Sequence, residues 1–171
     1  MYIGFKLQDE YDYLTNLSAA YLMSDHSTEG VALLEKYRNS QSYEVLYNYG
    51  TLLIFNGQYE EAETILRRAL QVGRRQLYDA EVEELELDIQ DEGSEPELDP
   101  IRVQLAFIAI RRGNTAAAEK SLMGVVSHGS TSKIIHAIAT CNLIAARGCT
   151  ELAEGMKRYA LPLLFDRVNN Q

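Results

Sequence analysis

Several residue types that mark particular protein classes are scarce or absent in this chain. Its 171 residues include no tryptophan, two cysteines and three prolines. Two cysteines are too few for a disulfide framework, and the absence of proline before Pro96 permits long helices. No apolar run approaches the roughly 18–20 residues of a membrane-spanning helix, and the first residues lack the layout of a secretory signal. We therefore expect a helical protein of the reducing cytosol.

Residues that could catalyse a reaction or bind a metal also lack a productive arrangement. The three histidines do not stand at metal-ligand spacing from a cysteine or an acidic residue. Neither Cys141 nor Cys149 has a base close to it in the sequence, and packing as a small residue is the ordinary role of such a cysteine. We expect no enzyme activity, no cofactor, no metal and no small-molecule ligand.

The negative charge of the chain is concentrated in one segment. The formal net charge is −9, but residues 79–99 contain 11 of the 25 acidic residues and no lysine or arginine. The rest of the chain therefore has 14 acidic residues against 16 basic ones. A strongly charged segment with few apolar side chains does not bury enough surface to fold by itself. We predict that residues 79–99 are a flexible acidic insertion.

One spacing of small and apolar residues occurs twice. A glycine is followed by alanine five positions later and by leucine nine positions later, and a small residue precedes the glycine by seven. The two copies are Gly50, Gly57, Ala62 and Leu66, and then Ala106, Gly113, Ala118 and Leu122. Small side chains at this spacing let two antiparallel helices approach closely, and the glycine forms the turn between them. The pattern is typical of the tetratricopeptide repeat, a helix–turn–helix unit of about 34 residues.

The turn glycines set the register of the predicted helices. First helices are expected over 43–55 and 100–112 and second helices over 59–74 and 115–126, with Ser42 and Asp99 as N-caps. Weaker copies lie upstream, from Leu14, and downstream, where 134–146 and 150–159 flank Gly148. We predict an all-α fold, a right-handed superhelical solenoid of about four antiparallel helix pairs. Residues 1–171 would form one domain with repeats at about 11–39, 43–75, 99–127 and 132–160, followed by a segment 161–171 that caps the solenoid or faces a partner.

First helices line the concave face of stacked helix pairs, where ligands usually bind. Amide side chains on this face can hydrogen-bond a peptide backbone, and aromatic ones offer apolar contact. An open alternative is that some of these residues pack in the core between repeats. The predicted partner-binding residues are Thr15, Asn16, Ala19, Met23, Tyr47, Asn48, Thr51, Phe55, Val103, Gln104, Phe107, Arg111, Ile138 and Asn142.

The charge of this predicted face narrows the class of partner. Arg111 is almost the sole basic side chain on the first helices, so capture of a C-terminal carboxylate is disfavoured. A longer peptide or a helix, held by apolar and amide contacts, is favoured. A second basic cluster lies on the second helix of the second repeat, and we expect its side chains to be exposed to solvent. Because the eleven acidic residues of segment 79–99 follow it, this cluster is a poor nucleic-acid surface. Its members are Arg67, Arg68, Arg74 and Arg75.

Several sequence blocks occur together in an order that is more specific than the repeat pattern. TNLSAA from Thr15 is followed by EVLYNYGTLLIFNGQYEEAETILRRAL, an arginine pair, the acidic insertion, IRVQLAFI and finally IIHAIATCNLI. This order resembles the N-terminal tetratricopeptide region of the seventy-two-kilodalton protein subunit of the eukaryotic signal recognition particle. The resemblance covers roughly residues 11–156.

The resemblance implies a scaffold rather than a catalyst. In that family the repeat region binds the C-terminal part of the sixty-eight-kilodalton partner subunit, and the particle delivers nascent secretory chains to the endoplasmic reticulum. It implies a cytoplasmic protein, with the nucleolus as a second site during particle assembly. RNA contact would be indirect, through the full particle, because the family's basic RNA-binding segment has no counterpart here. Two alternatives stay open: a generic adaptor for short peptide tails of a chaperone or transport complex, and an RNA-binding module.

Overall fold

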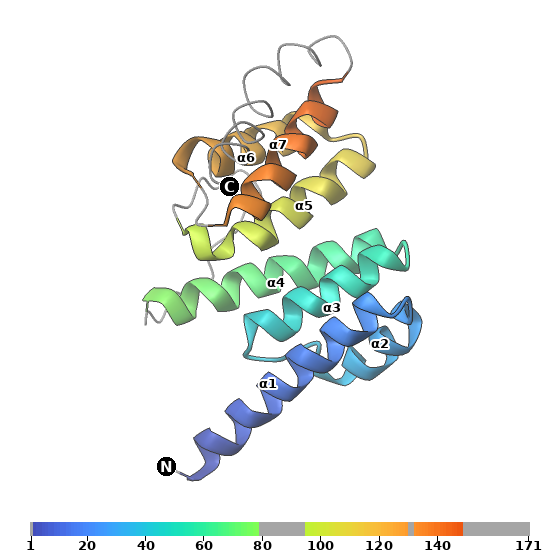
Figure 1. Ribbon diagram of the computed structural model, residues 1–171, viewed down its shortest axis with the longest axis vertical. Helices are drawn as coiled ribbons and strands as arrows, with labels where there is room; N and C mark the ends of the chain where they lie inside the picture. The colour runs from blue at the N-terminus through green and yellow to red at the C-terminus, as the bar shows by residue number, and fades with distance from the viewer. Residues whose placement is uncertain (1, 79–94, 130–131, 149–171) are drawn as a thin grey trace, which may run out of the picture. The chain divides into compact units, whose positions relative to one another are not determined.

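The computed structural model describes residues 2–78, 95–129 and 132–148, and these residues form seven α-helices and no β-strand (Figure 1). The all-α prediction is therefore confirmed. The chain divides into two compact units, residues 1–85 and 86–171. Within the described ranges, no helix is both long and apolar enough to span a bilayer. The predicted segments 79–94, 150–159 and 161–171 lie outside the described residues.

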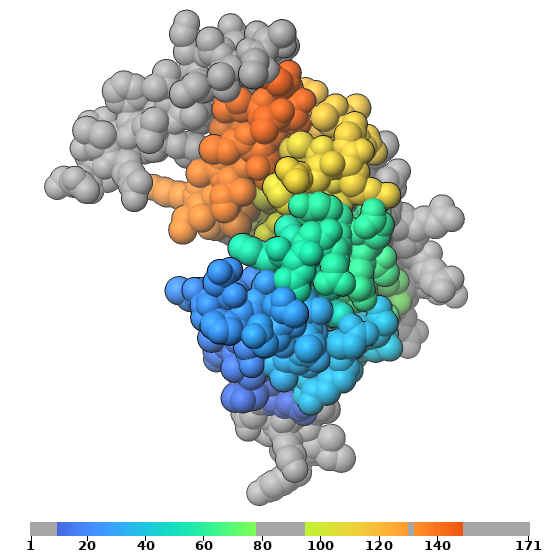
Figure 2. Space-filling model, turned by 90° about the vertical axis from the view of Figure 1, so that its right-hand side faces the viewer, coloured from blue at the N-terminus to red at the C-terminus, as the bar shows by residue number. Residues whose placement is uncertain are grey.

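The first unit contains two helix pairs. Helix α1 (Tyr2–Met23) packs on α2 (Ser27–Leu34), which continues into a 3₁₀ turn (Glu35–Tyr37). Helix α3 (Tyr43–Phe55) packs on α4 (Tyr59–Tyr78), and α3 also contacts both α1 and α2. In the space-filling view the blue surface of α1 and α2 adjoins the blue-green surface of α3 (Figure 2). Helices α1 and α3 are thus the first helices of two successive repeats.

The described residues of the second unit form three α-helices. A 3₁₀ turn (Pro96–Leu98) leads into α5 (Asp99–Arg111), which packs on α6 (Thr115–His128). Helix α7 (Lys133–Arg147) packs against both. The observed starts and ends of α3, α5, α6 and α7 lie within two residues of the predicted ones, and α4 ends four residues after Arg74.

Glycine turns and side-chain caps fix where these helices begin and end. Gly57 and Gly113 have φ angles of +74° and +82°, a conformation that side chains with a Cβ rarely adopt. The predicted cap Ser42 accepts a hydrogen bond from the backbone N–H of Val45, and Ser132 caps α7 in the same way. These local signals explain why the helix boundaries could be read from the sequence.

The small residues of the motif lie where two helices touch. Gly50 on α3 is buried, and a Cβ at this position would lie 2.6 Å from Leu66 Cγ on α4. Ala62, Ala106 and Ala118 have no solvent-exposed surface. The predicted close approach of antiparallel helices is therefore confirmed.

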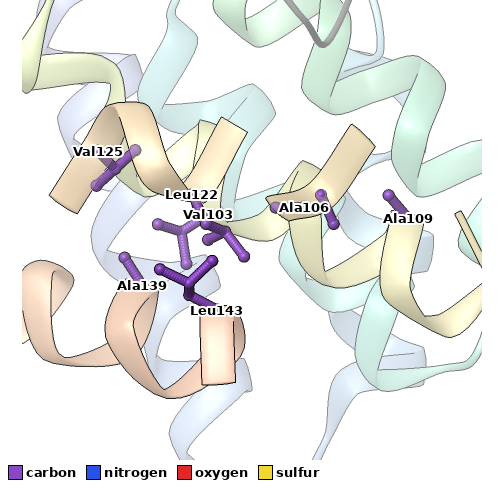
Figure 3. Close-up of a cluster of buried hydrophobic side chains, with 8 residues drawn as sticks. Val103, Ala106, Ala109, Leu122, Val125, Ala139 and Leu143 are labelled. Atoms are coloured by element: carbon purple, nitrogen blue, oxygen red, sulfur yellow. The ribbon is translucent and has the colours of Figure 1, made fainter. Parts of the chain in front are cut away.

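The core of the second unit is built from alternating small and large side chains of α5, α6 and α7. Figure 3 shows Leu122 and Val125 of α6, and Ala139 and Leu143 of α7, gathered around Val103 of α5. All of them are buried. Small and large apolar side chains together allow helices to pack closely.

One predicted N-cap has a different role. Asp99 is the first residue of α5, and its cap position is occupied by Leu98. The buried Asp99 carboxylate instead accepts from Arg102 at 3.3 Å and lies 3.1 Å from His128 Nε2. Arg102 also donates to the backbone oxygen of Glu95 at 2.6 Å and pairs with the Glu95 carboxylate. The last five residues of the predicted flexible insertion, 95–99, therefore belong to the folded unit.

The prediction that the arginines of α4 form a solvent-exposed face is also partly wrong. Arg74 is buried, and Arg67 and Arg68 are half-buried. Arg67 pairs with Glu63 one turn earlier, and Arg68 donates to the backbone oxygen of Asn39 in the loop before α3. Arg68 thus joins α4 to the loop before α3, while Arg75 is exposed as expected.

Candidate protein-interaction surface

Helices α1 and α3 contact each other and run in the same direction (Figure 1). Helix α2, which separates them in the sequence, runs in the opposite direction. The amide of Asn48 on α3 fixes their register, donating to the backbone oxygen of Thr15 at 3.1 Å and to Ser18 Oγ at 2.9 Å. Just beyond the two helices, Ser27 Oγ donates to Asn56 Oδ1. The C-terminal ends of α1 and α3 therefore lie at the same level.

Two large apolar side chains stand at that common level. Met23, the last residue of α1, is 89% exposed, and Phe55, the last residue of α3, is 66% exposed. Isolated apolar side chains on a surface need no explanation, but two together at the ends of adjacent first helices form a candidate contact site. We call this pair the Met23–Phe55 ledge.

The other predicted residues of the first unit divide into accessible and buried groups. Asn16 is exposed, and Thr15, Ala19 and Tyr47 are half-buried. Asn48 and Thr51 are buried, and the hydroxyl of Thr51 donates to the backbone oxygen of Tyr47 at 2.9 Å. The open alternative, that some predicted residues pack between repeats, describes Asn48, whose amide contacts α1. The accessible set, together with the ledge, contains no charged side chain.

In the second unit the predicted residues are also divided. Gln104, Phe107 and Asn142 are half-buried, while Arg111 and Ile138 are exposed. Val103 is buried in the core between α5, α6 and α7, so it does not belong to an accessible surface. The described part of this unit leaves a mixed amide, aromatic and basic set on α5.

Comparison with known proteins identifies the repeat. The tetratricopeptide repeat family model matches residues 43–72, which cover α3 and most of α4. The chain is 32% identical over 127 residues to the signal recognition particle subunit SRP72 of Caenorhabditis elegans, an alignment that covers 74% of this chain. The chain is therefore similar to tetratricopeptide-repeat proteins over α3 and most of α4, and to SRP72 over most of its own length. The chain spans 19% of the length of that relative. No solved structure gives a significant match.

The tetratricopeptide-repeat match and the likeness to SRP72 both point to a non-enzymatic scaffold, because stacked helix pairs of this kind form surfaces that bind other proteins. In the described ranges, no three histidine, cysteine or acidic side chains come together as a metal site. Cys141, on α7, is exposed.

One surface residue of the first unit escaped the sequence prediction. Tyr13 on α1 is exposed and lies on the same helical face as Asn16, Ala20 and Met23, which are three, seven and ten positions further on. This spacing was present in the sequence. The predicted surface residues, however, were chosen from the copy of the tetratricopeptide motif that begins at Leu14, and Tyr13 lies just before it.

Hydrogen bonds and ion pairs in the first unit join neighbouring helices. The buried Tyr49 hydroxyl donates to the Glu35 carboxylate, which joins α3 to the 3₁₀ turn after α2. Burial, and then this hydrogen bond, raise the pKa of Tyr49 well above its usual value. Arg38 bridges Glu35 and Glu61 at 3.2 Å and 2.9 Å, so the turn is also tied to α4. This polar network joins α3, the 3₁₀ turn and α4 of the first unit.

Proposed function

We propose that this chain is a protein-interaction scaffold of the signal recognition particle, and that its first helices hold the C-terminal region of the sixty-eight-kilodalton partner subunit. The whole particle would support cotranslational protein targeting to the endoplasmic reticulum. The chain would act in the cytoplasm and contact RNA only through the other components.

The Met23–Phe55 ledge is the observation that carries this proposal. A protein that binds a charged tail needs cations on its first helices, whereas the accessible candidate residues of α1 and α3 are apolar, amide or hydroxyl-bearing. Such a surface suits an apolar or amphipathic polypeptide segment, with Met23 and Phe55 in contact with its large side chains and Asn16 available for its backbone. The likeness to SRP72 supports the choice of particle.

The direct test is the affinity of the 171-residue chain for C-terminal fragments of the partner subunit, measured by calorimetry. We expect binding, with Phe55→Ala weakening it by about 1–2 kcal/mol, or roughly tenfold, as for an aromatic contact residue. Leu77→Ala is the matched control, because Leu77 is an exposed apolar residue on the second helix α4. It should leave the affinity unchanged.

Two results would contradict the proposal. The absence of binding at tens of micromolar would remove the partner assignment. Equal effects of Phe55→Ala and Leu77→Ala would remove the first-helix surface. The alternative adaptor for short peptide tails predicts instead that an acidic tail peptide binds tightly and that binding weakens with added salt.

A further inference from the structure

The turns beside the Met23–Phe55 ledge are acidic. The turn that follows α1 and the turn that follows α3 lie next to each other, because Ser27 Oγ donates a hydrogen bond to Asn56 Oδ1 (Figure 1). Residues 20–30 and 52–61, which contain the ledge and both turns, include four acidic side chains and no lysine or arginine. Three of these carboxylates are exposed, and we call them the acidic rim: Asp25, Glu29 and Glu60.

Two members of the acidic rim have a structural reason to be acidic. Glu29 lies in the first turn of α2 and Glu60 in the first turn of α4. The positive end of a helix dipole favours an acidic side chain at such a position. Asp25 lies before the N-cap residue of α2, His26, and so outside both helices. The dipole therefore does not account for Asp25.

The backbone at Asp25 would suit glycine. Asp25 stands where the other repeats have their turn glycine, since Gly30 and Leu34 follow it by five and nine residues. Its φ angle is +59°, near the +74° of Gly57 and the +82° of Gly113. Among the residues that the structure describes, no other residue with a side chain has a positive φ. A Cβ is disfavoured in this conformation, so the aspartate is retained against the preference of the backbone.

Local hydrogen bonding does not explain the aspartate either. Aspartate is tolerated at positive φ chiefly where its short side chain bonds to the nearby backbone. The Asp25 carboxylate is exposed and has no hydrogen bond or ion pair with the described part of the chain. The neighbours Ser24 and His26 donate to backbone oxygens of this turn instead. What aspartate adds over glycine here is an exposed negative charge, two residues after Met23.

We propose that Asp25 is a specificity-determining residue of the Met23–Phe55 ledge, and that the segment bound there is a basic, amphipathic polypeptide. Its apolar side chains contact Met23 and Phe55, and a lysine or arginine beside them pairs with the acidic rim. Charge complementarity of this kind selects partners and rejects those of like charge. The inference rests on the proposed function for its surface and adds the chemistry of the partner.

Two synthetic peptides are the probes. They share one amphipathic pattern of leucine and phenylalanine, with lysine at every charged position in one and glutamate in the other. Because the whole chain has a net charge of −9, the deciding measurement is the effect of Asp25→Asn on the affinity for the lysine peptide. We expect a loss of about two- to fivefold, as for an exposed ion pair, that shrinks as salt is added. Affinity for the glutamate peptide should not fall.

Two further variants separate this role from charge and folding. Glu97→Gln removes one charge from an exposed residue of the second unit and should leave the affinity for the lysine peptide unchanged. Asp25→Gly should raise the urea midpoint of unfolding, because glycine suits the positive φ, and should still weaken binding of the lysine peptide as much as Asp25→Asn does. A residue with a purely structural role would not give greater stability together with weaker binding.

Equal affinities of the unsubstituted chain and Asp25→Asn for the lysine peptide at low salt would overturn the inference, as would equal effects of Asp25→Asn and Glu97→Gln. The C-terminal fragments of the partner subunit separate it from the proposed function. If Phe55→Ala weakens their binding and Asp25→Asn does not, the function stands and this inference is wrong. If the fragments do not bind, but binding of the lysine peptide depends on both residues, the inference stands and the partner assignment is wrong.

Discussion

The substitution Gly50→Ala tests the packing of α3 on α4. An added Cβ would lie 2.6 Å from Leu66 Cγ and 2.7 Å from Leu66 Cδ2. Nonbonded carbon atoms normally approach to about 3.5–4.0 Å. Leu66 is fully buried, so its side chain has no space in solvent into which it can rotate. The two helices must therefore move apart, or the leucine must adopt a strained rotamer.

Two opposing terms set the size of this effect. Overpacking a close-packed core costs about 1–3 kcal/mol. Alanine in a helix interior is more favourable than glycine by roughly 0.5–1 kcal/mol. The steric term is the larger one, so we expect Gly50→Ala to lower the free energy of unfolding by about 1–2 kcal/mol.

Urea unfolding of the full chain, followed by circular dichroism, measures this change. Gly124→Ala is a matched control, because Gly124 lies inside α6 and a Cβ there meets no atom within 4 Å. It should stabilise the chain by roughly 0.5–1 kcal/mol. If Gly50→Ala stabilises the chain as Gly124→Ala does, the close-approach reasoning is wrong. Leu66→Ala alone should cost about 2–5 kcal/mol, and adding Gly50→Ala to it should recover part of that loss.

Three further predictions use the same unfolding assay. Asn48→Ala should cost about 1–3 kcal/mol, because the Thr15 backbone oxygen and Ser18 Oγ on α1 each lose the hydrogen bond from the buried amide; an equal cost for the exposed Asn16→Ala would contradict this. Arg102→Ala should cost about 3–5 kcal/mol, since it leaves the buried Asp99 carboxylate without its guanidinium, and pairing it with Asp99→Asn should restore part of the stability. Tyr49 has a raised pKa because of burial and then its hydrogen bond to Glu35, so the folded state holds the proton more tightly than the unfolded state. Its stabilisation should be complete below about pH 10 and decline above it, and chains with Tyr49→Phe should lack this alkaline decline.

Helix boundaries were predictable because their causes are local. A serine that caps α3 and a glycine at positive φ that ends it act within a few residues of the chain. The close contact of Gly50 with α4 was predictable for a related reason. Two helices joined by a short turn must meet, and the small residues show which faces meet.

The burial of particular surface candidates was not predictable in the same way. Val103 and Ile138 occupy the same position in successive repeats, yet Val103 is buried and Ile138 is exposed. Val103 is buried because side chains of α6 and α7 pack around it, and such packing is a long-range property. Asn48 likewise appeared suited to a bound peptide, but its amide is used by α1, thirty or more residues earlier in the chain.

By itself, the amino-acid sequence determined the helical class and the repeat register, because spacing and composition express these directly. The tertiary structure alone decided which polar groups are used inside the fold. It placed Asp99 beside Arg102 and His128, buried Arg74 and left Met23 and Phe55 exposed at one level. Burial and hydrogen bonding depend on neighbours that are distant in sequence, and only the packed helices bring those neighbours together.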